Sequence, residues 1–208
     1  MLAALLAALL VASGAAGAPR WCASLRDEQR TAAIVAFNSG VGASSSSASA
    51  AAYRAALALD PHFTEAALNL GALAMEAGEL DEAERLFSNA LRLASSAPAA
   101  PPCAALRAST AHRASALNNL ANVALRRAQA SALRRPERFD REIAAATALF
   151  FRAHAVSPAT RVDALYNAGV ALREQRLHDD ARSAFLRVLN LAPTHRTVQA
   201  IDLGKVAI

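Results

Sequence analysis

Four asparagines recur at one phase of the chain and are the strongest candidates for polar recognition. They are Asn38, Asn69, Asn119 and Asn167, and each is followed two residues later by a glycine or an alanine. An asparagine amide both donates and accepts hydrogen bonds, which is also the chemistry of a peptide bond. A row of such amides is therefore suited to binding a peptide backbone. The alternative is that asparagine occupies these positions without a role in binding.

The residue types that usually carry catalysis or bind metals are scattered. The five histidines form no His-Glu-x-x-His pair and no zinc-type cluster with the two cysteines. The glycine-rich residues 40–44 lack the preceding strand and the lysine of a phosphate-binding loop. His178 stands beside Asp179 and Asp180, where acidic residues are expected to stabilise the start of a helix. We therefore predict a protein that is not an enzyme and has no metal and no cofactor.

A second repeated pattern describes the elements that would position the asparagines. It consists of a small residue, an aromatic residue four positions later and a small or short residue three positions after that. These spacings place the three residues on one face of a helix, and a proline five positions further stops the helix in three cases. The four instances are Ser49, Tyr53, Ala56 and Pro61; Ala83, Phe87 and Ala90; Ala146, Phe150, Ala153 and Pro158; and Ala181, Phe185, Val188 and Pro193.

The two patterns together resemble the tetratricopeptide-repeat family, whose unit of roughly 34 residues is a pair of antiparallel helices. The resemblance is fullest at residues 64–95, which contain Asn69-Leu70-Gly71, and at residues 162–193. It extends over nearly all of the chain after Trp21. It implies an all-α, right-handed superhelical solenoid of about four helix-turn-helix units.

The predicted domain organisation follows from where the patterns begin and end. It consists of a signal peptide at 1–18, a degenerate first unit at 30–61, a second unit at 64–95, a proline- and alanine-rich linker at 96–109, a third unit at 110–158, a fourth unit at 162–193 and a C-terminal segment at 194–208. The interval from asparagine to aromatic is longer in unit three (119 to 150) than in unit two (69 to 87). This insertion either lengthens the first helix or forms a loop broken at Pro136. The linker is expected to divide the array into two pairs of units.

The first 18 residues contain no charged side chain and open with an apolar run, as a secretory signal peptide does. The expected localisation is the secretory pathway, either the lumen of the endoplasmic reticulum or the exterior. The alternative is a membrane anchor formed by an uncleaved N-terminal segment. In an oxidising compartment Cys22 and Cys103 can pair or remain free, and the sequence leaves both outcomes open.

The charge pattern argues against nucleic acid as a partner. The chain has 22 basic and 17 acidic residues, and every basic residue except Lys205 is an arginine. The densest arginines, between residues 126 and 141, have Glu137, Asp140 and Glu142 among them, which is typical of a solvated loop or helix face. The chain ends on Val206-Ala207-Ile208, an apolar edge for which we predict self-association.

The resemblance also implies a function. In this family the first helix of each unit lines a concave groove, and in the O-GlcNAc transferases asparagines at the corresponding position hold the backbone of an extended peptide. Asn38, Asn69, Asn119 and Asn167 match that position. We therefore predict a protein-protein interaction scaffold that binds a partner protein or an extended peptide on the concave face. The residues preceding the asparagines are expected to set its side-chain preference. The alternative is a fragment of the lumenal repeat region of a membrane-bound O-mannosyltransferase-like enzyme.

Overall fold

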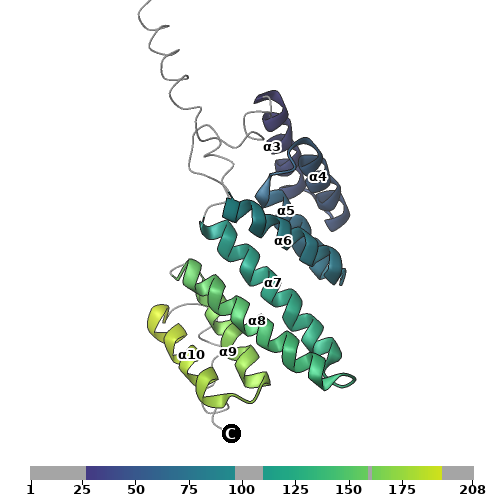
Figure 1. Cartoon of the computed structure of the whole chain (residues 1–208). Coiled ribbons are helices and arrows are strands. Elements are labelled where there is room, and N and C mark those ends of the chain that lie inside the picture. The colour runs from purple at the N-terminus through teal and green to yellow at the C-terminus, as the bar shows by residue number, and fades with distance from the viewer. Residues whose placement is uncertain (1–26, 97–109, 159–160, 194–208) are drawn as a thin grey trace, which may run out of the picture.

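The computed structural model of the chain describes residues 27–96, 110–158 and 161–193, and every regular element within them is a helix. Four antiparallel pairs follow one another along the chain (Figure 1). The pairs are α3 (Asp27–Val41) with α4 (Ser46–Leu59), α5 (Thr64–Glu76) with α6 (Leu80–Ser96), α7 (Thr110–Ser131) with α8 (Pro136–Val156), and α9 (Val162–Glu174) with α10 (His178–Leu191). This confirms the predicted all-α solenoid of four helix-turn-helix units.

Local sequence explains several of the helix boundaries. The hydroxyl of Ser45 accepts a hydrogen bond from the backbone N–H of Ala48 and so caps the start of α4. Pro136 occupies the first turn of α8, where its missing N–H costs nothing. After α5, Gly78 adopts a φ of 81°, a left-handed conformation that glycine reaches without steric cost. The chain can therefore turn back at once into α6.

Each pair is held by an aromatic side chain of the second helix that lies on the small residue of the first. A Cβ added to Gly71 would stand 2.7 Å from Cε1 of Phe87, and one added to Gly169 would stand 2.6 Å from Cε1 of Phe185. Gly40 has the same relation to Tyr53, at 2.7 Å. The glycine that follows each of these asparagines is thus explained by close helix crossing.

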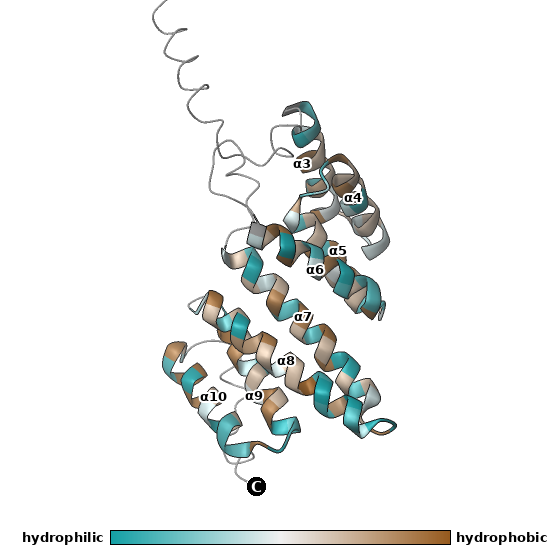
Figure 2. Cartoon of the chain, viewed as in Figure 1, coloured by the Kyte–Doolittle hydropathy of each residue, from teal (hydrophilic) through white to brown (hydrophobic). Residues whose placement is uncertain are grey.

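The pairs stack because each second helix packs on the first helix of the next unit: α4 on α5, α6 on α7 and α8 on α9. Apolar residues line these contacts, and hydrophilic and hydrophobic residues alternate along the helices (Figure 2). The first helices α5 and α7 also contact each other directly. Since α5 and α7 approach each other more closely than α6 and α8 do, we take the side of the first helices as the inner face of the stack.

Unit three departs from the others in the length of both helices. α7 has 22 residues and α8 has 21, whereas α5 and α9 each have 13. The insertion therefore lengthens the second helix as well as the first, and Pro136 begins α8 instead of breaking a loop. Ile143 and Ala128 pack together in the extended part, with Ala171 of the neighbouring unit.

The expected division into two pairs of units is not observed, because α6 packs against α7 as α8 packs against α9. The linker does not interrupt the stack, since the interface depends on residues within the helices. Leu91 of α6, for example, packs beside the cluster around Leu117 and Phe150.

Several sequence predictions concern residues outside the described part of the chain. They are the signal peptide at 1–18, nearly all of the linker at 96–109, Cys22 and Cys103, and the apolar C-terminal segment at 194–208.

Candidate functional site

The four asparagines lie on the first helices and face away from the second helix of their own unit. Each stands two residues before the small residue that meets the aromatic ring, and two residues correspond to about 200° around a helix. Asn69, Asn119 and Asn167 are partly buried, whereas Asn38 is exposed. The amides therefore point toward the inner face of the stack.

A row of polar contacts joins successive units near the N-terminal ends of the first helices. His112 Nε2 of α7 lies 3.4 Å from Glu65 Oε1 of α5. Arg161, just before α9, donates a hydrogen bond to the hydroxyl of Ser115 in α7. The same guanidinium lies 3.7 Å from Asp163. This row fixes the spacing of units two, three and four on one side of the asparagines.

A second set of contacts joins the units near the C-terminal ends of these helices. Arg126 of α7 donates to the carbonyl of Met75 in α5 at 2.9 Å. Gln129 of α7 donates to Glu174 of α9 at 3.1 Å. Asn69, Asn119 and Asn167 lie between the two sets, at the middle of helices whose spacing is held at both ends.

Within the described residues, none of the four asparagine side chains makes a hydrogen bond to another residue. The amides are therefore available to a ligand.

A strip of residues three positions after the asparagines lies beside them on the same helix faces. In units one, two and four this residue is apolar, and in unit three it is a further amide. The strip consists of Val41, Ala72, Asn122 and Val170. Sequence inspection missed it, although helical spacing from the asparagines would have found it. The inner face therefore offers apolar contacts beside most of the amides.

Two of the residues that precede the asparagines are buried, and the other two are partly buried against aromatic rings, so their influence on the side-chain preference of a ligand stays a prediction. Leu68 and Asn118 are buried. Phe37 packs on Tyr53, with ring centroids 5.5 Å apart, and Tyr166 packs on a core phenylalanine in the same way. One helical step places these residues nearer the core than the asparagines. The buried oxygen Oδ1 of Asn118 has no hydrogen-bond partner.

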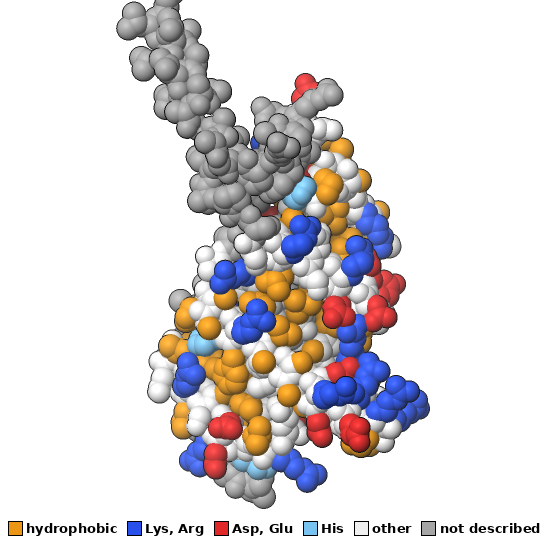
Figure 3. Space-filling view, viewed as in Figure 1, with side chains coloured by type: hydrophobic (Ala, Val, Ile, Leu, Met, Phe, Trp, Pro, Cys, Tyr) orange, Lys and Arg blue, Asp and Glu red, His pale blue; other side chains and the backbone are white. Residues whose placement is uncertain are grey.

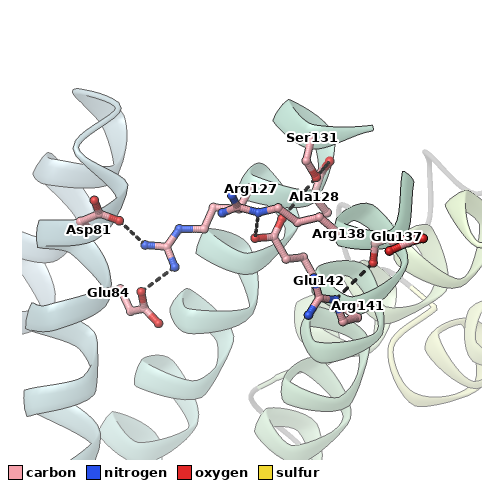
Figure 4. A network of polar contacts seen from close by, with 9 residues as sticks. All are labelled: Asp81, Glu84, Arg127, Ala128, Ser131, Glu137, Arg138, Arg141 and Glu142. Atoms are coloured by element: carbon pink, nitrogen blue, oxygen red, sulfur yellow. Dashed lines mark hydrogen bonds and ion pairs between the residues drawn. The ribbon is translucent and has the colours of Figure 1, made fainter. Parts of the chain in front are cut away.

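Some of the arginines in the extended part of unit three are engaged in contacts within the protein. Arg127 reaches from α7 to Glu84 and Asp81 of α6, with each contact at 2.5 Å (Figure 4). Burial lowers the pKa of Arg127, but hydrogen bonds and charge from Glu84 and Asp81 outweigh it and raise the pKa above its usual value. Arg138 pairs with Glu142 one turn along α8, at 2.8 Å. Arg127 therefore joins α7 to α6, whereas Arg138 pairs within α8.

Two further properties concern chemistry and membranes. In the described residues, no three His, Cys, Asp or Glu side chains lie close enough together to hold a metal ion. No helix in the same part of the chain is both long and apolar enough to cross a bilayer.

Comparison with known proteins places the chain among helical-repeat structures. Two models of the tetratricopeptide repeat match it, at residues 46–109 and 162–195. A crystal structure of MamA protein is similar at 20% identity and a TM-score of 0.59, over 87% of this chain and 82% of MamA. A thermophilic TPR protein in Thermus thermophilus has 16% identity and a TM-score of 0.64, over 84% and 81% of the two chains.

A third structural relative belongs to an assembly. It occurs in the crystal structure of the APC/C hetero-tetramer Cut9-Hcn1, with 13% identity and a TM-score of 0.64, over 85% of this chain and 30% of the other. A search of the curated proteins finds no significant relative by sequence. The repeat matches and the glycine-on-aromatic crossings agree: the chain contains tetratricopeptide repeats at 46–109 and 162–195, and these structures share its helical-repeat fold.

Proposed function

We propose that this protein is a non-catalytic scaffold that binds an extended segment of a partner protein along the inner face of its first helices. Asn38, Asn69, Asn119 and Asn167 hydrogen-bond the backbone of the bound segment. The apolar members of the neighbouring strip contact its side chains. The bound segment runs across the units, so that each unit contributes at least one amide.

The observation that carries the proposal is that the asparagine side chains face the inner side of the stack and have no hydrogen-bond partner among the described residues. Asn69, Asn119 and Asn167 face away from their own units, and no described side chain uses their hydrogen-bonding groups. A partly buried amide without a partner loses free energy relative to one that is hydrogen-bonded. A peptide bond supplies both the donor and the acceptor that such an amide lacks.

The spacing of the units supports an extended ligand. Packed helices lie about 8–10 Å apart, and an extended chain rises about 3.3 Å per residue. Neighbouring asparagines would then contact backbone groups about three residues apart. An extended segment also leaves its backbone N–H and C=O groups free to meet the amides, which a helical segment does not.

The proposal can be tested with peptides selected from a random library on the purified protein. The affinities of the selected peptides are then measured for the wild type and for the double variant Asn69→Ala/Asn119→Ala. Each lost hydrogen bond should cost about 0.5–1.5 kcal/mol, so the double variant should bind roughly tenfold more weakly. Scrambling a peptide should reduce its affinity less than this double substitution does, because the amides contact backbone.

The matched control is Arg134→Ala/Arg135→Ala, in the exposed turn between α7 and α8. It should bind the peptides as the wild type does, and added salt should weaken binding only slightly because the amides are neutral. Equal affinity of the wild type and the asparagine variant would eliminate the amide row. A steep fall in affinity with salt would place the peptide on the arginines instead.

We also propose that the chain enters the secretory pathway, or stays anchored to a membrane by its N-terminal segment. The charge-free residues 1–18 support this proposal. The test is N-terminal sequencing of the mature protein from cells. A new N-terminus close to Pro19 supports cleavage, and an intact Met1 in the membrane fraction supports the anchor. An intact Met1 in the cytosolic fraction would contradict both.

A further inference from the structure

A groove runs along the outer side of the stack between α6 and α8, with α7 as its floor. Helices α6 and α8 both pack on α7. Two hollows of about 370 and 320 Å³ lie between them. Their lining residues are one helical turn apart on α7, at Leu117 and Leu120, and on α8, at Arg152 and Leu149. The two hollows therefore lie end to end between α6 and α8, and together they are called the groove.

The groove is long because unit three is long. Its lining extends from Glu84 to Ser95 on α6 and from Arg113 to Arg127 on α7. At 1.5 Å per residue these stretches measure about 16 and 21 Å, which is three to four helical turns. By comparison, the hollow between α8 and α10 is short. Its lining residues on these two helices begin at Phe151 and Arg187, so they come from the last turns only.

The centre of the groove is apolar. Leu91, Leu120 and Leu149 come from three different helices and are all partly buried. Figure 3 shows apolar side chains gathered over the middle of this face, with separate arginines around them. Partly exposed leucines from three helices offer a surface that another apolar surface could cover.

The charge of the groove is concentrated at one end. Arg113 and Arg152 are exposed there, and neither forms an ion pair with any residue that the structure describes. At the other end Arg127 is bound to Glu84 and Asp81. A ligand would therefore meet two uncompensated positive charges at the first end and a neutralised network at the second.

We propose that this groove binds an amphipathic helix of a partner protein, with the acidic first turn of that helix beside Arg113 and Arg152. The groove is lined by side chains of three complete helices, so it offers no free backbone edge to an extended strand. A helix satisfies its own backbone and can place apolar residues at i, i+4 and i+7 on the leucines. Carboxylates are also most favourable at the N-terminal end of a helix.

The experiment uses a synthetic helix of about three to four turns as the probe. It carries leucines at i, i+4 and i+7 and two glutamates in its first turn. A second peptide replaces the glutamates with lysines, and a third has the same composition with the leucines scrambled. Binding is measured by fluorescence anisotropy to the full chain, to Arg113→Glu/Arg152→Glu, and to the control Arg134→Glu in the exposed turn of unit three.

The glutamate peptide should bind the wild type and Arg134→Glu with similar micromolar affinity. Its affinity for Arg113→Glu/Arg152→Glu should fall at least tenfold, and the lysine peptide should prefer that variant over the wild type. Circular dichroism of the variants checks that they fold, and amide chemical shifts of Leu120 and Leu149 should change when the glutamate peptide is added.

Three results would overturn the proposal: no saturable binding of the glutamate peptide, equal binding of the scrambled peptide, or unchanged affinity after the charge reversal. The variant Asn69→Ala/Asn119→Ala separates this groove from the inner face. It should bind the glutamate peptide as the wild type does, and a loss of binding would place that peptide on the inner face.

Discussion

The two helices of a unit cross at a glycine in the regular units two and four, but at an alanine in unit three. In the regular units a glycine lets a phenylalanine ring rest against the backbone of the first helix, and no methyl group fits there. In unit three Ala121 stands at the equivalent position and packs in one cluster with Phe150. The short helices are thus held together by one very close crossing. The longer helices of unit three cross with the methyl group of Ala121 between them.

Length changes how unit three is attached to its neighbours. The extended part of α7 carries Arg127, which binds two carboxylates of α6, and Gln129, which reaches Glu174 of α9. Extra helical turns therefore supply contacts between units as well as within one. The insertion that lengthens unit three also connects it to both neighbouring units.

The largest expected effect on stability comes from removing the buried phenylalanine ring that lies between the two helices, both in a regular unit and in unit three. Phe87 and Phe150 are fully buried. We expect Phe87→Ala and Phe150→Ala each to lower the free energy of unfolding by about 3–5 kcal/mol. The loss should be smaller for Phe150→Ala, because α7 and α8 continue to pack beyond that crossing. Urea denaturation measures both values, and a cost below about 1 kcal/mol for Phe87→Ala would contradict this account of the regular pair.

The next effect concerns the close crossing itself. Gly71→Ala places a methyl group 2.7 Å from a buried ring, which should cost about 1–3 kcal/mol although alanine is the better helix former. Gly42→Ala is the control, because its added Cβ meets only the backbone oxygen of Asn38 at 3.7 Å. In the background Phe87→Leu, the cost of Gly71→Ala should shrink. A stabilising Gly71→Ala would show that the ring can move aside.

A smaller effect on stability is expected at the turn between the two helices, where the regular units two and four differ. Arg176 has a φ of 62° in the turn of unit four, where unit two has Gly78 with a φ of 81°. The left-handed conformation costs roughly 1 kcal/mol for a residue with a side chain. Arg176→Gly should therefore raise the midpoint of thermal unfolding by a few degrees. No change, or a decrease, would mean that the Arg176 side chain contributes more than its backbone conformation costs.

The smallest effect is expected at the interface between units two and three. Asp81 is 99% exposed and Glu84 is 49% exposed, so water screens their contacts with Arg127. Arg127→Ala should cost about 1 kcal/mol or less at low salt, and the difference from the wild type should shrink in high salt. Arg135→Ala, at the exposed turn, is the control. A loss that is large and independent of salt would show that the arginine acts through packing of its stem.

The candidate site was only partly predictable from sequence. The sequence shows that Asn69 and Asn119 lie on a different side of their helices from the small residues, because helical periodicity alone determines which residues share a face. The burial of Leu68 and Asn118 was not anticipated: each lies one residue before an asparagine, and that single step turns it toward the core. The polar contacts between units, such as His112 with Glu65, join residues far apart in sequence and leave no periodic pattern.

The helices, their pairing and the repeat pattern could be predicted from residue types and spacing, because small and aromatic residues at helical spacing can be buried only between helices. The packing of whole helices set several features that the spacing of residues in the sequence does not predict. It divided the insertion of unit three between α7 and α8, packed α6 directly on α7 despite the intervening linker, and left a groove between α6 and α8. These outcomes depend on how whole helices stack, and stacking follows from contacts between residues that no local pattern connects.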